Sequence, residues 1–305
     1  GSEGAVALLE RALALAPDFA PAVAAYAAAC VTAWFLPGSD HHRDSEQRAR
    51  DAVCRALEVA GDLAEAHHAA GALHLHDGDL PGALQELEAA IAIAPNYTDS
   101  LETLGQMECE IGRREAGRKR LRLALDLAPG LMGARMELAR QAALEGDHDQ
   151  FEAFLAPLDE PLRRSIAVLQ LRVREAVYRR DRVAIEKLLR EFSSETELGR
   201  AMIDSLGDIA LGRAPAAEAV ARAETYLANL DSPRFKSLIR QVLVETLLFA
   251  GETALAESQL LLAAESRLID VTWLDRCPLI AELHGSPGLA RARELVAARL
   301  RGVDI

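Results

Sequence analysis

The segment AIAIAPNYTDS at residues 90–100 decides the fold class, because its pattern recurs along the chain. The related segments are ALALAPDFAPA (12–22), ALEVAGDLAEA (56–66) and ALDLAPGLMGA (124–134). The last three of the four start 34 residues apart, whereas the first two start 44 residues apart. A fixed period of this length is typical of repeat architectures, in which each unit is one supersecondary element. The ten extra residues predict an insertion at about residues 32–45.

Each unit contains two predicted helices, and its small residues fall at fixed places. Gly71 and Gly105 lie inside the first helix of successive units, where we expect two helices to approach closely. Gly78 and Gly112 follow that helix, and glycine readily adopts the left-handed conformation that ends a helix. A proline or glycine then stops the second helix. The pattern predicts a series of antiparallel helix hairpins.

These residues, in this order and at this period, resemble the tetratricopeptide repeat (TPR) over residues 3–145. His74 and Glu108 stand where the family commonly has aromatic residues. The resemblance implies an all-α fold, an α-solenoid of antiparallel hairpins wound into a right-handed superhelix. It also implies a protein–protein interaction scaffold.

Beyond residue 145 the repeat loses phase, but helical segments and breakers continue. We expect diverged TPR-like hairpins over residues 146–270 and a capping segment over residues 271–305, since solenoids need a polar end. The predicted helices are 151–158, 162–179, 183–192, 197–211, 216–230, 235–250, 254–268 and the closing helix 289–301.

The closing stretch WLDRCPLIAELHGSPGLARARELVAARL, residues 273–300, resembles the end of repeat tails on bacterial serine/threonine protein kinases. It departs from that family at residues 286–289, which read Ser-Pro-Gly-Leu in place of Asp-Pro-Arg-Phe. The chain begins Gly-Ser without a methionine, which we interpret as an expression scar on a piece of a larger protein. We therefore expect a regulatory or partner-binding region of a bacterial signalling protein. The alternative is a free-standing adaptor in secretion, pilus or envelope assembly.

Composition limits the classes of partner. The net charge of −13 argues against nucleic acid and against an anionic membrane, since both attract basic surfaces. The four cysteines show no paired spacing, which favours a reduced, cytoplasmic protein. No apolar run approaches the roughly 18 residues of a membrane span.

Motifs for catalysis are lacking from the sequence. It contains no GxSxG, no P-loop and no GxGxxG, and it lacks the glycine-rich loop and the DFG motif of kinases. The histidines at 67, 68, 74 and 76 lack the i,i+4 spacing of a helical zinc site. We predict no enzyme activity, no cofactor and no metal; a helical enzyme is the least favoured class.

The TPR resemblance implies a concave groove formed by the first helices. Its predicted lining residues are Glu65, His68, Leu75, Asp99, Glu102, Gln106, Met136 and Arg140. In the family, Lys and Asn side chains can clamp the carboxylate of a chaperone tail. The matching positions hold His68, Ala72, Glu102 and Gln106, so we expect no clamp ligand. The acidic residues favour a basic or neutral protein segment.

Two further features have alternative interpretations. Trp34 and Phe35 precede the insertion and either contact a partner or pack beneath the loop. The basic run Arg172, Arg174, Arg179, Arg180 and Arg182 is either a solvated outer face or a contact for an acidic partner.

Overall fold

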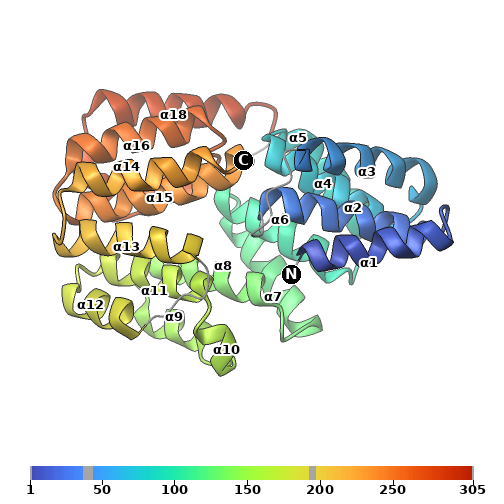
Figure 1. The fold of residues 1–305 in the computed structure, drawn as a ribbon, viewed down its shortest axis with the longest axis horizontal. Helices are drawn as coiled ribbons and strands as arrows, with labels where there is room; N and C mark the ends of the chain where they lie inside the picture. The colour runs from blue at the N-terminus through green and yellow to red at the C-terminus, as the bar shows by residue number, and fades with distance from the viewer. Residues whose placement is uncertain (1, 37–43, 192–196, 304–305) are drawn as a thin grey trace.

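The computed structural model describes residues 2–36, 44–191 and 197–303, and every element in these ranges is helical (Figure 1). The predicted all-α fold is confirmed. The predicted insertion falls mostly on residues 37–43, which lie outside the described residues. Its first part belongs to α2, which continues to Phe35.

The first half consists of TPR-like hairpins in which successive helices pack as antiparallel neighbours. The helix α1 pairs with α2, and the hairpins that follow are α2–α3, α4–α5, α6–α7 and α8–α9. Their bounds are α1 (Ser2–Leu15), α2 (Ala20–Phe35), α3 (Ser45–Ala60), α4 (Ala64–Asp77), α5 (Leu80–Ile93), α6 (Thr98–Glu110), α7 (Arg114–Leu127), α8 (Met132–Glu145) and α9 (His148–Leu155).

The expected roles of glycine are confirmed in these hairpins. A Cβ atom at Gly71 would lie 2.6 Å from Cγ of Leu87, and one at Gly105 would lie 2.8 Å from Cγ of Leu121. Only a residue without a side chain lets α4 meet α5, and α6 meet α7, at this distance. Gly78, with φ of 79°, ends α4 in the left-handed conformation.

The second half continues the hairpins with less regular helices. They are α10 (Glu160–Arg163), α11 (Ile166–Tyr178), α12 (Arg182–Glu191), α13 (Glu197–Leu211), α14 (Ala216–Ala228), α15 (Pro233–Phe249) and α16 (Thr253–Glu265). The expectation of one continuous helix over residues 162–179 is wrong. Ser165 starts α11 as an N-cap whose hydroxyl accepts from the Val168 amide at 3.4 Å. Residue 192 of the predicted helix 183–192 lies outside the described residues.

The capping segment has the expected form, a turn-rich stretch followed by a helix. It contains α17 (Val271–Arg276), the short 3₁₀ helix η1 (Ile280–Leu283) and α18 (Pro287–Arg299). The last helix packs on α16. The domain limits at residues 145 and 270 stay predictions.

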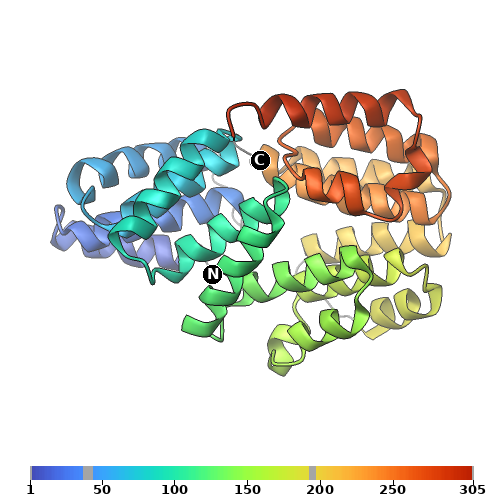
Figure 2. The ribbon, with the colours of Figure 1, turned by 180° about the vertical axis from the view of Figure 1, so that it is seen from behind.

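The two halves of the chain meet again, which closes the concave side of the stack (Figures 1 and 2). Helix α15 contacts α4, α11 and α13, while α17 contacts α6 and α8. One hydrophobic core runs from Leu75 to Val303, and a second, from Val6 to Leu73, belongs to the first repeats. Helix α15 is buried around most of its circumference, as expected for a helix enclosed by others. Its position converts the predicted open groove into a partly enclosed cavity.

Candidate partner-binding site

A cavity of about 530 Å³ lies where the first helices of the hairpins face α15. Side chains from α2, α4, α6, α8, α11 and α15 line it. Six of the eight predicted groove residues are among them: His68, Leu75, Glu102, Gln106, Met136 and Arg140. Glu65 and Asp99 do not line the cavity, but the charges of their carboxylates raise the pKa of the half-buried His68, which does line it.

Three predicted groove residues form an acidic rim, by which we mean Glu65, Asp99 and Glu102. None of the three takes part in an ion pair within the described parts of the chain, although most acidic residues around the cavity do. The only hydrogen bond to the Asp99 side chain within those parts comes from Tyr97, whose hydroxyl donates to its Oδ2 at 3.4 Å. The rim therefore presents negative charge without a counter-charge.

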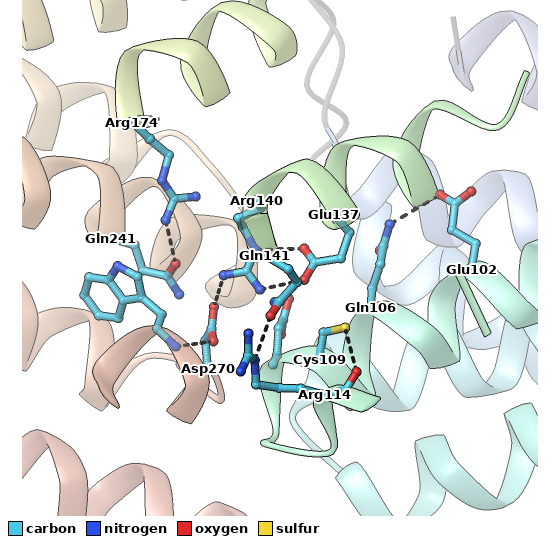
Figure 3. Close-up of polar contacts among 12 residues, drawn as sticks. Glu102, Gln106, Cys109, Arg114, Glu137, Arg140, Gln141, Arg174, Gln241 and Asp270 are labelled. Atoms are coloured by element: carbon cyan, nitrogen blue, oxygen red, sulfur yellow. Dashed lines mark hydrogen bonds and ion pairs between the residues drawn. The ribbon is translucent and has the colours of Figure 1, made fainter. Parts of the chain in front are cut away.

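Glu102 is the most perturbed member of the rim. Burial, and next the charge of Asp99, raise its pKa to about 7, while the backbone amide of Ala134 opposes the rise by donating to the carboxylate. Gln106 Nε2 also donates to Glu102 Oε1, at 3.4 Å (Figure 3). The carboxylate lies against the first turn of α8, where Gly133 leaves room for it and the helix dipole favours an anion. At neutral pH this group lies near the midpoint of its ionisation.

His68 stands at the edge of the cavity beneath the rim. Burial lowers its pKa, and the carboxylates of Asp99 and Glu65 only partly offset that effect. Its ring meets Tyr97 edge-on at 5.5 Å, and its Nδ1 lies 3.3 Å from the Ser100 hydroxyl. Because the imidazole stays neutral near pH 7, it does not compensate the rim.

The floor of the cavity is held by three buried ion-pair groups that join distant segments. The first links α15 to α6, where Arg234 Nη2 lies 2.9 and 2.8 Å from the two carboxylate oxygens of Glu110. Beside it, Phe35 stacks on His76 at a centroid distance of 4.0 Å and meets Phe235 edge-on. Burial, and then Arg234, hold the pKa of His76 well below its usual value.

The second group centres on Arg140 and corrects an expectation for that residue. Its guanidinium donates to Glu137 at 2.7 and 2.8 Å and to Asp270, the N-cap residue of α17, at 2.7 Å (Figure 3). Arg140 was expected to face a partner, but its charge is used inside the protein. Burial raises the pKa of Asp270 to about 7, against the lowering effect of Arg140.

The third group corrects the interpretation of Arg174 as part of a solvated basic face. The Arg174 side chain is 12% exposed and donates to Glu245 of α15 at 2.8 and 2.6 Å. The Tyr178 hydroxyl and the Trp273 indole also donate to Glu245, each at 2.6 Å. A carboxylate inside a core needs such partners to remain ionised.

The two aromatic residues before the insertion, Trp34 and Phe35, lie in different environments. Trp34 is only 1% exposed and packs in the core of the first repeats, so it is not available to a partner. Phe35 lines the cavity instead. Leu75 lines the cavity as well but belongs to the main core.

The arrangement offers binding groups and no evident nucleophile. Burial raises the pKa of the Cys109 thiol, which disfavours the reactive thiolate. Within the described ranges, no group of three or more His, Cys, Asp or Glu residues could hold a metal ion. A search of the same ranges finds no helix with the length and apolar character needed to cross a membrane.

Several cavity residues were missed from the sequence, above all Arg234, Gln241 and Asp270. The helix that carries the first two reads as an apolar segment interrupted by polar residues. Polar side chains at positions 241 and 245, four residues apart in that segment, were the available clue to a buried network.

Comparison with solved structures finds yeast Tom70. Its structure aligns over 96% of this chain and 62% of its own chain, with 15% sequence identity and a TM-score of 0.43. This chain thus spans less than two thirds of that one. No protein-family model matches the sequence, and no curated protein matches it either. The site is therefore interpreted from its own residues.

Proposed function

We propose that this chain is a non-catalytic scaffold that binds a basic or neutral segment of another protein at the acidic rim. The observation that carries the proposal is the absence of any ion pair to Glu65, Asp99 and Glu102 among the described residues, where the neighbouring charges are paired. A helical repeat fold supports the same role, because stacked hairpins form extended surfaces for partners.

The electrostatics of the rim favour a cationic partner. Asp99 raises the pKa of Glu102, so the two carboxylates repel each other. A lysine or arginine placed beside them would relieve that repulsion and favour the ionised form of Glu102. Charged groups at such a surface set specificity and association rate more than total affinity.

The same charge distribution disfavours other classes of partner. A chain of net charge −13 with an acidic rim repels phosphate backbones, anionic lipid and the carboxylate of a chaperone tail. We propose a cytoplasmic location, on the basis of the four unpaired cysteines.

Within this role we favour the regulatory or partner-binding region of a larger bacterial signalling protein such as a serine/threonine kinase. The resemblance of residues 273–300 to the ends of kinase repeat tails supports it. A free-standing adaptor in secretion, pilus or envelope assembly is the second candidate, and the repeat fold is equally compatible with it. The native reading frame before residue 1 decides between them: a kinase domain there supports the first, and a start codon supports the second.

The binding role is tested with a display library of random 12-residue peptides selected on the intact chain. We expect enrichment of lysine and arginine, and loss of binding in a double variant with Asp99→Asn and Glu102→Gln. The matched control is Glu58→Gln, since Glu58 is an exposed carboxylate on α3, remote from the cavity lining. Selected peptides that are predominantly acidic, or peptides that bind the double variant equally well, would contradict the proposal.

A further inference from the structure

The cavity behind the acidic rim contains buried hydrogen-bond donors that have no acceptor among the described residues. Gln241 Nε2 and Arg234 Nε have no hydrogen-bond partner in the parts of the chain that the structure describes. Both side chains line the cavity, and the residues are only 1% and 6% exposed. A buried donor without an acceptor is unfavourable, so these two groups indicate a missing acceptor.

The orientation of the Gln241 amide is set by its neighbour. Arg174 Nη2 donates to Gln241 Oε1 at 3.5 Å, and the reverse orientation would place two donors together (Figure 3). The amide nitrogen is therefore the free end. Arg234 and Gln241 are seven residues apart on α15, so they share a helix face and lie about 10 Å apart along its axis.

The charges around the cavity do not balance. Three guanidinium groups and four carboxylates line the cavity, and a fifth carboxylate, Glu245, pairs with Arg174 outside the lining. The set therefore carries two excess negative charges when all groups are ionised. The cations are Arg140, Arg174 and Arg234, and the anions are Glu102, Glu110, Glu137, Glu245 and Asp270. Excess charge of one sign in a poorly solvated space favours a ligand of the opposite sign.

The cavity lining also includes apolar side chains, among them Val31, Met136 and Ile239. Glu102 lies at one end of the polar row and Gln241 at the other (Figure 3). A volume of about 530 Å³ lies within the range of sites for small organic molecules.

We propose that this cavity binds an organic cation, with an ammonium or guanidinium group at Glu102 joined through an aliphatic stem to carbonyl or hydroxyl oxygens that accept from Gln241 and Arg234. A free small molecule and a basic side chain of a bound segment share this chemistry. The site shares Glu102 with the acidic rim, but its donors Gln241 and Arg234 line the cavity itself, so a free small molecule can be tested without a partner protein.

The test uses Nα-acetyl-arginine N-methylamide and the corresponding citrulline compound, which has nearly the same shape without the charge. Both are titrated into the intact chain at pH 8 by calorimetry or ligand-observed NMR. We expect the arginine compound to bind about tenfold more tightly, the gain of one charge-assisted hydrogen bond. Equal affinity for the two compounds, or no binding of the arginine compound at millimolar concentration, would overturn the proposal.

Variants locate the binding within the cavity. Glu102→Gln should abolish the preference for arginine, whereas Glu58→Gln should keep it. Gln241→Leu should weaken both compounds severalfold, because both present the same carbonyl oxygens. Leu238→Trp should block both compounds by filling the cavity. This variant provides a second test of the cavity site if Gln241→Leu does not fold. A preference that survives Glu102→Gln would place the cation elsewhere and refute the assignment.

Competition separates the two sources of the cation. A rim-selected peptide that displaces the arginine compound assigns the site to a side chain of the partner. A peptide that binds together with the compound assigns it to a free small molecule, and both results support the site. If the compound binds while no peptide is selected, the scaffold role fails and the cavity site stands.

Discussion

Replacing Glu102 by glutamine should make the protein more stable at alkaline pH, even though the change is expected to damage binding. The carboxylate has an ordinary pKa of 4.5 and a pKa of about 7 in the folded chain. Since each pKa unit corresponds to about 1.4 kcal/mol, ionised Glu102 destabilises the fold by about 3 kcal/mol at most. Partial exposure to water makes the effect smaller than this limit.

The pH dependence of the effect follows from the direction of the shift. Between pH 4.5 and 7 the folded state holds the Glu102 proton more tightly than the unfolded state. The contribution of this group to stability is therefore fully present below pH 4.5 and is lost as pH rises through 7. Glutamine cannot ionise, and its amide oxygen can still accept from Ala134 and Gln106.

The assay is urea unfolding at pH 4, 6 and 8 of the wild type, Glu102→Gln and the exposed control Glu58→Gln. We expect the variant to match the wild type at pH 4 and to exceed it by up to about 3 kcal/mol at pH 8. The control should follow the wild type at every pH. A Glu102→Gln variant that is no more stable at pH 8, or that gains equally at pH 4, would refute the reasoning.

Three further substitutions test the fold. Gly105→Ala should destabilise by about 1–2 kcal/mol in urea unfolding, because overpacking against α7 outweighs the helix propensity of alanine, whereas Gly4→Ala, with no neighbour within 4 Å, should not. Arg234→Met should destabilise by about 3–5 kcal/mol by leaving Glu110 buried without a cation, and adding Glu110→Leu should restore most of the loss. Recovery of less than half in the double variant would contradict this account. Ser165→Ala should cost about 1 kcal/mol and loosen the start of α11 in amide hydrogen exchange.

The repeat half was predictable because its determinants are local. Gly71 and Gly105 specify a close approach within one hairpin, and their neighbours Leu87 and Leu121 lie sixteen residues further along the chain. A 34-residue period places such contacts in phase without any knowledge of the rest of the chain. The groove positions followed from the same phase, and six of the eight line one cavity.

The closure of the groove was not predictable in the same way. It depends on contacts such as Arg234 with Glu110 and Arg140 with Asp270, which are more than a hundred residues apart in sequence. In the sequence, Arg140 resembles any other polar residue on the concave face of a first helix. Only the return of α17 to α8 decides that its charge is used internally.

At this site the carboxylates that have a guanidinium partner stabilise the fold, whereas Glu102, which has none, does not. Glu110, Glu137 and Glu245 each have a guanidinium within hydrogen-bonding distance. Glu110 and Glu245 join distant helices, while Glu137 pairs within α8 with Arg140, which also reaches Asp270. Glu102 shares the same cavity, lacks such a partner and destabilises the fold when ionised. A glutamine would keep its local hydrogen bonds without that penalty, so stability alone does not account for a carboxylate here. Residues that lower stability in this way are typical of functional sites, and the function that we propose for the negative charge of Glu102 is the binding of a cation.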